Sequence, residues 1–148
     1  MKKNLSLLAM LLFGYSVFAQ NTNTLLNNYI SVKNALVNSD TKMASQAIKS
    51  LYQGIKEDGN FKQKETLLKS TEKMSKATGI EKQRAVFNEV STRVWEIVKN
   101  AKKTNKTVYY QYCPMKKAYW LSTEKEIENP YYGAAMLSCG SVVETKQQ

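Results

Sequence analysis

The chain has 148 residues, of which 22 are lysine or arginine, 12 are aspartate or glutamate and none is histidine. The absence of histidine removes the commonest metal ligand and the commonest general base. It excludes Ser-His-Asp and Cys-His catalytic sites, and it disfavours the usual zinc sites, which combine Cys with His or hold four Cys. We therefore expect a protein that is not an enzyme.

The first twenty residues have the layout of a secretory signal peptide. Lys2 and Lys3 precede an apolar run from Leu5 to Phe18, and the small residue Ala19 comes before a polar stretch. The run is short and ends abruptly for a transmembrane helix, although a membrane anchor is the alternative. We expect cleavage near Ala19 and a periplasmic or secreted product, with no stable membrane insertion and no nucleic acid as a partner.

About 128 residues remain after cleavage, enough for a single domain over 21–148 and too few for two ordinary ones. The positive charge is uneven: residues 21–106 hold 16 lysines and arginines against 8 acidic residues, whereas 107–148 hold four lysines and four glutamates. Because the lysines are dispersed singly, a solvated helical surface explains the excess better than a binding site for a polyanion.

Four segments with helical periodicity follow one another along the first part of the chain. In each of them apolar residues recur at steps of three and four, as on the core-facing side of an amphipathic helix. The segments span residues 23–38, 43–55, 61–77 and 78–101. Because only short turns join them, they predict a mainly α fold in which residues 21–106 form an antiparallel four-helix bundle.

Local signals at the segment ends support these boundaries. Ser39-Asp40 interrupts the first segment and supplies an N-cap for the second. Thr78 and Glu81 fit a capping box at the start of the fourth. Met43 is expected to fill the core beneath the second segment.

The composition changes after residue 106. Stretches rich in β-forming residues start at Val108, Ala118 and Ser141, and six of the nine tyrosines lie between residues 109 and 132. We expect residues 107–148, the C-terminal cap, to form short strands and loops that pack on the bundle, with many of the aromatic rings in the cap's own core.

Two cysteines and two methionines mark the ends of one stretch of this cap. Cys113-Pro114-Met115 opens the stretch, and Met136 followed three residues later by Cys139 closes it. Thiolate and thioether are soft ligands, the mixture that monovalent copper prefers. Proline stiffens the first half, and a spacing of three puts both sulfurs of the second half on one side of a turn. The four sulfurs predict a copper(I) site.

Three aromatic residues are predicted to surround the four sulfurs as a second layer. Tyr112, Trp120 and Tyr132 would limit the access of water and oxidants. The thiolates must lose their protons to bind metal, so affinity should fall as the pH drops. This interpretation predicts a periplasmic copper(I) carrier or buffer.

The alternative for the two cysteines is a structural disulfide between Cys113 and Cys139, the ordinary fate of two cysteines in a secreted chain. Such a bridge would stabilise the fold by roughly 3 to 4 kcal/mol. The protein would then be a metal-free interaction module of the cell envelope. Its cap would present aromatic residues to a partner protein, namely Tyr109, Trp120, Tyr131 and Tyr132. Both hypotheses stay open at this stage, and the bridge could form whenever metal is absent.

Several motifs are specific enough to carry a resemblance to a known family. They are Cys113-Pro114-Met115, Tyr119-Trp120-Leu121-Ser122, Asn129-Pro130-Tyr131-Tyr132-Gly133, Met136-x-x-Cys139-Gly140 and the helical segment YISVKNALVNSD. The set resembles the domain-of-unknown-function family numbered 3347, found in secreted bacterial proteins and sometimes attached to membrane-fusion subunits of heavy-metal efflux pumps. The resemblance implies heavy-metal handling with an efflux adaptor as partner. Cys-Pro-Met is also similar to the metal-binding motif of copper exporters, which usually continues with histidine and proline instead of Lys116 and Lys117.

Overall fold

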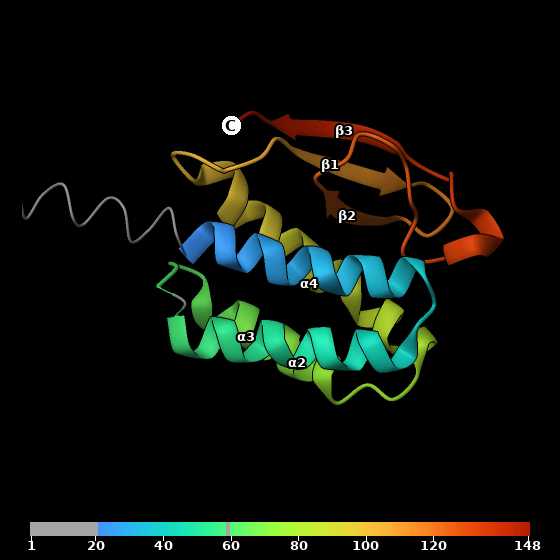
Figure 1. Ribbon diagram of the computed structural model, residues 1–148, viewed down its shortest axis with the longest axis horizontal. Helices are drawn as coiled ribbons and strands as arrows, with labels where there is room; N and C mark the ends of the chain where they lie inside the picture. Colours follow the sequence, from blue (N-terminus) through green and yellow to red (C-terminus); the bar gives the residue numbers. More distant parts are fainter. Residues whose placement is uncertain (1–20, 59) are drawn as a thin grey trace, which may run out of the picture.

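The structure is a computed structural model that describes residues 21–58 and 60–148, so the predicted signal peptide lies outside it. The described residues contain four helices, a short 3-10 helix and a three-stranded antiparallel sheet (Figure 1). They are a helix at 21–37, α2 Thr41–Asp58, α3 Lys64–Ser75, α4 Ile80–Asn100, β1 Val108–Cys113, β2 Ala118–Ser122, η1 Gly133–Met136 and β3 Ser141–Lys146. Among them, no helix combines the length and apolarity that a membrane span requires.

The helical segments predicted from periodicity are all present, with shifts of one to three residues at their ends. The largest shifts are of three residues: α2 continues to Asp58, and α3 begins at Lys64 and leaves Phe61 in the preceding turn. Asp40 caps α2 as predicted, because its Oδ1 accepts a hydrogen bond from the Met43 N–H at 2.9 Å.

Two predictions about these helices are wrong. The N-cap of α4 is Gly79 at φ 89 with no side-chain cap, so Thr78 and Glu81 do not form a capping box. Glycine takes this position because it adopts a positive φ at little cost. Met43 is 55% exposed. It lies about 100° around α2 from Ala44, which belongs to the buried stripe.

The sheet has the strand order β2-β1-β3, with both neighbours antiparallel to β1. The three predicted strands are present, and the third continues to Lys146. In the β1–β2 hairpin Cys113 faces Ala118, which leaves a turn of Pro114 to Lys117. The pairing of β1 with β3 places Tyr112 opposite Ser141.

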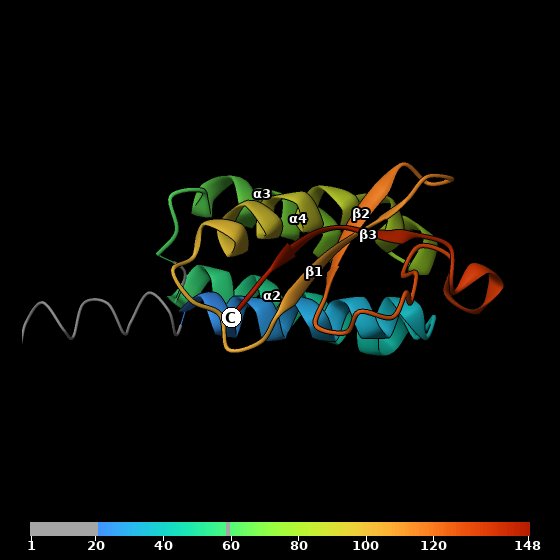
Figure 2. The same ribbon diagram turned by 90° about the horizontal axis from the view of Figure 1, so that it is seen from above.

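The helices and the sheet share one hydrophobic core. The sheet lies across the helix at 21–37 and α4, with α2 and α3 on the far side of those helices (Figures 1 and 2). Trp95 of α4 stacks on Tyr110 at 4.7 Å between ring centroids, and Tyr110 stacks on Tyr119 at 4.8 Å. From the first helix, the Tyr29 hydroxyl accepts a hydrogen bond from the Leu121 N–H of β2. The cap is therefore fastened to the helices by apolar and polar contacts.

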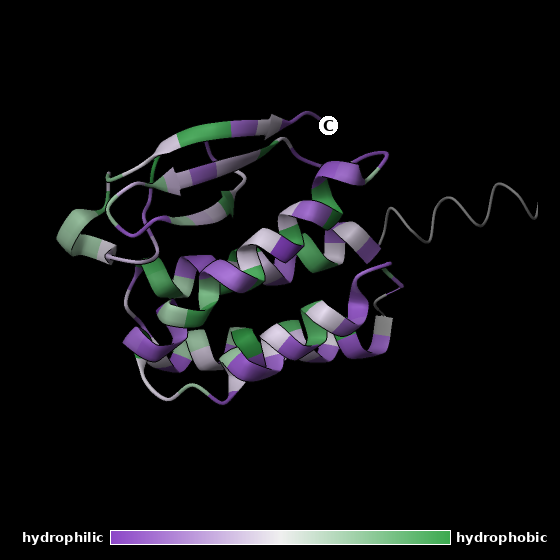
Figure 3. Cartoon of the chain, turned by 180° about the vertical axis from the view of Figure 1, so that it is seen from behind, coloured by the Kyte–Doolittle hydropathy of each residue, from purple (hydrophilic) through white to green (hydrophobic). Residues whose placement is uncertain are grey.

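Outside this core, the hydrophobic colours of Figure 3 extend to η1 and to the middle of β3. The corresponding side chains are partly exposed, with Leu137 just after η1 at 40% and Val143 of β3 at 47%. The cap therefore carries apolar surface both next to η1 and in the middle of β3.

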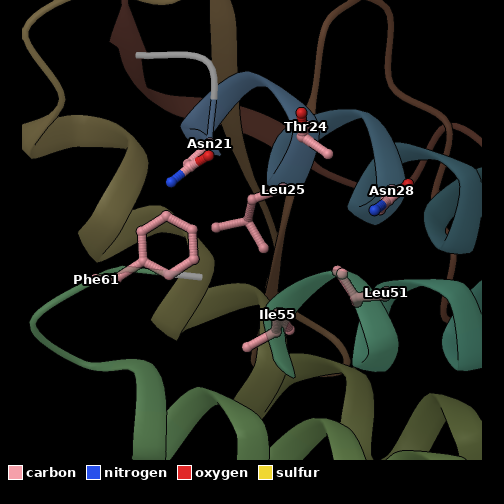
Figure 4. A pocket seen from close by; sticks show the side chains of 8 residues that line it. Asn21, Thr24, Leu25, Asn28, Leu51, Ile55 and Phe61 are labelled. Atoms are coloured by element: carbon pink, nitrogen blue, oxygen red, sulfur yellow. The ribbon is translucent and has the colours of Figure 1, made fainter. Parts of the chain in front are cut away.

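A small pocket between the first helix and α2 contains none of the residues predicted to bind a metal (Figure 4). Its volume is about 10 Å³, roughly the space of one water molecule. Apolar side chains and the amides of Asn21 and Asn28 line it.

Candidate metal centre

The fold brings together the two cysteines, which are 26 positions apart in the chain. Cys113 ends β1, and Cys139 lies two residues before β3, whose first residue pairs with Tyr112. Their Sγ atoms are 3.4 Å apart, and both residues are free thiols. The β1–β2 turn and η1 lie at the same end of the molecule (Figures 1 and 2). The antiparallel pairing of β1 with β3 is what joins the pair.

The hairpin turn wraps around the Cys113 sulfur, which is fully buried. Burial acts to raise the pKa of Cys113, but hydrogen bonds outweigh it and hold the pKa below its ordinary value. These bonds come from the backbone N–H groups of Lys116 and Met115, from the Cys139 thiol and from the Asn129 side chain. Because N–H donors stabilise a negative sulfur, the turn favours a thiolate at Cys113.

Cys139 is half-buried and is the outer member of the pair. Its hydrogen bond with Cys113 raises its pKa, and both burial and the nearby charge of Cys113 act in the same direction. The two groups are close enough to titrate as a coupled pair. The buried Cys113 sulfur is therefore the one that ionises more easily, and the Cys139 sulfur is the one closer to solvent.

Asn129 organises the loop that carries Cys139, a role the sequence analysis missed. The residue is fully buried. Its Nδ2 donates to the Cys139 carbonyl at 2.7 Å, and its Oδ1 accepts from the Tyr131 N–H at 2.8 Å. The Asn129-Pro130 pair is an ordinary turn signal, and only the polarity of Asn129 within an aromatic-rich stretch could have indicated a buried role.

Arg84 of α4 fixes the same loop to the helices. Its Nε donates to the Pro130 carbonyl at 2.7 Å, and its Nη2 donates to the Leu36 carbonyl and the Ser39 hydroxyl at 2.8 and 2.9 Å. Arg84 is 8% exposed, so these bonds form away from bulk water. A single guanidinium thus links the end of the first helix, α4 and the loop before η1.

Each of the two methionines lies within three residues of one cysteine in the chain. Met115 stands in the hairpin turn and is 63% exposed, whereas Met136 is half-buried at the end of η1. The Cys139 N–H donates to the Met136 carbonyl at 3.1 Å. Among the four predicted ligands, the structure shows a direct contact between sulfur atoms for the two cysteines. The ligand role of the methionines stays a prediction.

The three predicted second-layer aromatics occupy different positions around the pair. Trp120 is fully buried and packs on Gly140, where a Cβ atom would lie 2.7 Å from its Cη2. Tyr132 is half-buried, and its ring lies under the Lys116 ammonium at 4.9 Å. Tyr112 packs against Tyr119 with the two rings tilted by 38°, on the face of β1 opposite Cys113. Trp120 is thus placed to exclude water near Cys139.

The aromatic surface expected for an interaction module is partly missing. Trp120 is fully buried, and Tyr131 is 4% exposed with its hydroxyl donating to the Tyr119 carbonyl. Residues with so little accessible surface cannot anchor a partner protein. Tyr109 and Tyr132 are half-buried, so the predicted set of four does not form one exposed patch.

Within the described residues, no group of three or more His, Cys, Asp or Glu side chains lies close enough together to hold one metal ion. The candidate donors are therefore the two cysteine sulfurs, with thioethers close by in the chain. Two thiolates without carboxylate or imidazole suit a soft, monovalent ion of low coordination number better than Zn²⁺, Mg²⁺ or Ca²⁺.

One family model matches the chain. It is described as a protein of unknown function, DUF3347, and it covers residues 25–106. The match ends six residues after α4, before β1 begins, so both cysteines lie beyond it. No curated protein and no solved structure is detectably similar to the chain.

Proposed function

The chain belongs to the DUF3347 family of proteins of unknown function, and on the geometry of its cysteine pair we propose that it binds copper(I). Cys113 and Cys139 would be the anionic ligands. Met115 and Met136 would be neutral thioether ligands that allow the metal to exchange. The observation that carries the proposal is the 3.4 Å separation of two thiols whose turn already stabilises a thiolate.

The sulfur separation helps to choose between a metal and a disulfide. With a metal–thiolate distance of about 2.3 Å, two thiolates lie roughly 3.8 Å apart in a tetrahedral site and further apart in a trigonal or linear one. A disulfide requires about 2.05 Å. The observed 3.4 Å is nearer the tetrahedral value, so a tetrahedral site completed by two thioethers fits with the smallest movement of the two cysteine sulfurs.

Burial supports a site that retains copper in its reduced form. Cys113, the inner cysteine of the pair, and the neighbouring Trp120 are fully buried. A dry, sulfur-rich environment favours copper(I), because the divalent ion prefers nitrogen and oxygen ligands. The protein would hold copper without performing chemistry on it.

The cellular setting is part of the same proposal. The signal-peptide pattern of residues 1–20 supports a location in the periplasm or outside the cell, where the protein would act in copper or heavy-metal handling. A heavy-metal efflux adaptor is the partner we propose, on the resemblance described above. A carrier or a buffer both fit this setting.

We also propose that the four helices form an antiparallel bundle. Support comes from the contacts of α2 with α3 and of α3 with α4, and from the short turns between consecutive helices. Short connections force neighbouring helices to run in opposite directions.

The test is a competition for copper(I) between the reduced protein and a chromophoric copper(I) chelator. We expect one copper per chain in the wild type and none in Cys113→Ser/Cys139→Ser, with unchanged helical circular dichroism. Met115→Leu should weaken binding by about tenfold, which corresponds to the loss of roughly 1.4 kcal/mol.

The matched control is Met43→Leu, because Met43 is similarly exposed but lies on α2, away from the pair. It should bind as the wild type does. Tight copper binding by the double serine variant would show that the proposed ligands are wrong. Native mass spectrometry of protein isolated without reductant separates the copper form from a disulfide form that is lighter by two hydrogens.

A further inference from the structure

Two lysines stand in the hairpin turn that wraps the Cys113 sulfur. Lys116 and Lys117 are both exposed. In the part of the chain that the structure describes, no carboxylate lies within ion-pairing distance of either ammonium group. The candidate metal centre is therefore bordered by two positive charges that nothing in the described fold neutralises.

Lys117 occupies a backbone position that disfavours lysine. Its φ is 51°, in the left-handed region, which glycine adopts freely and which asparagine and aspartate tolerate better than other residues. A non-glycine residue is strained there, because its Cβ atom crowds the backbone. Lys117 therefore keeps its exposed charge in the turn at a cost in backbone strain.

Lys116 is also held at the site rather than dispersed in solvent. Its backbone N–H donates to the Cys113 sulfur. Its ammonium lies 4.9 Å from the centroid of the Tyr132 ring, a cation–π distance. Tyr132 directly precedes η1, so Lys116 bridges the segments that carry the two cysteines.

A recess of about 260 Å³ opens between this turn and the first turns of α4. The charged residues of its lining are Lys116, Lys117, Glu81 and Arg84. Glu81 is already bonded to Arg84 at 2.8 Å, and the other Arg84 nitrogens donate to Pro130, Leu36 and Ser39. Arg84 is thus already hydrogen-bonded within the protein. Lys116 and Lys117 are the cations of the recess that can bind a carboxylate of a partner.

The net charge of the candidate metal centre with copper(I) bound also favours an anionic partner. Two thiolates and one copper(I) sum to one negative charge, which the two lysines exceed. A molecule approaching the exposed side of Cys139 therefore meets a positive rim, and such a rim attracts anionic partners and repels cationic ones.

We propose that Lys116, Lys117 and the recess beside them recognise an acidic segment of a copper(I)-carrying protein and dock it for metal transfer. This inference rests on the proposed function. Copper(I) would pass from a sulfur of the carrier to Cys139 and then to Cys113. Each copper–sulfur bond to the carrier is replaced by one to the cysteines. A receiving thiol that is still protonated gives its proton to water, the released carrier thiolate takes one up from water, and no electron is exchanged.

The test uses two synthetic copper(I) peptides as donors. Both contain the same Cys and Met ligands, flanked by glutamates in one peptide and by lysines in the other. Transfer to the full-length mature protein is followed by stopped flow. At low ionic strength we expect the acidic donor to transfer at least about tenfold faster, with the advantage lost in high salt.

Substitutions test whether the preference for the acidic donor comes from the two lysines of the hairpin turn. Lys116→Gln/Lys117→Gln should lose the preference, whereas Lys42→Gln/Lys49→Gln, which removes two exposed charges from α2, should retain it. Lys117→Gly should raise the urea midpoint because the strain is relieved, and it should also slow transfer from the acidic donor.

Each outcome bears on one of the two proposals. Equal rates from both donors, or a preference that survives Lys116→Gln/Lys117→Gln in a protein that loads fully from a chelator, would overturn the docking proposal and leave copper binding intact. Failure to load from the chelator as well as from both peptides would overturn copper binding, and the docking proposal with it.

Discussion

Cys113 and Cys139 differ in their surroundings although their sulfurs are in contact. The hairpin turn directs backbone N–H groups at Cys113, whereas Cys139 is half-buried and receives no such cluster of donors. The same 3.4 Å contact therefore shifts the two pKa values in opposite directions. A pair of this kind can form a thiolate without placing two negative charges side by side in the metal-free protein.

This asymmetry predicts a two-step titration of the reduced, metal-free protein. The first thiolate should appear below the ordinary pKa of 9.0 and the second above it. Thiolate absorbance in the ultraviolet measures both steps. Cys139→Ala should remove the upper step, and Met115→Leu, which keeps the backbone N–H, should change neither. A single step of two protons near 9.0 would contradict the assignment.

Among the structural elements, the loop before η1 decides whether the cysteines meet. Gly133 starts η1 at φ 55, and a Cβ atom there would lie 2.8 Å from the Val37 carbonyl oxygen. That oxygen belongs to the end of the first helix and cannot move aside easily. The close approach of η1 to this helix end thus depends on glycine.

Gly133→Ala is therefore expected to destabilise the protein by about 3 kcal/mol, through the positive φ and the forced contact together. It should also weaken copper binding, because the loop to Cys139 shifts. The control is Gly54→Ala in α2, where the new Cβ would approach Asn28 Nδ2, an atom at the end of a side chain. This helical change should be neutral or stabilise by up to about 1 kcal/mol. Urea unfolding measures both, and equal effects would refute the argument.

At the scale of the whole molecule, buried tyrosine hydroxyls connect the cap to the helices. Tyr29 bonds Ser91 of α4 at 2.6 Å and accepts from Leu121 of β2. Desolvation by burial raises the pKa of Tyr29, Tyr110 and Tyr131 above the ordinary value of 10.0. The folded state thus keeps these hydroxyls neutral at a pH where the unfolded chain ionises them.

Global stability should consequently decline at alkaline pH. Because the folded pKa values are raised, this contribution is complete below pH 10.0 and is lost as the pH rises above it. The slope is about 1.4 kcal/mol per pH unit for each tyrosine that ionises only on unfolding. Tyr29→Phe should cost stability at neutral pH and reduce the alkaline slope. Urea midpoints across the alkaline range test this, and a constant midpoint would contradict it.

Features that depend on a few neighbouring residues could be predicted from the sequence. Helical periodicity located the four helices, β-forming residues located the three strands, and Asp40 was recognised as an N-cap. The family assignment rests on the same helical stretch. The two errors each concern a choice between adjacent residues. Gly79 rather than Thr78 is the N-cap of α4, and Ala44 rather than Met43 lies in the core.

For the candidate site, the sequence determined the donor atoms, two thiols and two thioethers within one stretch, and it excluded imidazole. Only the tertiary structure decided that Cys113 and Cys139 meet, that Asn129 and Arg84 hold the loop between them, and that Lys116 and Lys117 remain unpaired by any carboxylate of the described chain. The physical reason is that periodicity and capping act within one or two turns of chain. The meeting of two cysteines depends instead on the register of β3 against β1, which is set by packing throughout the core.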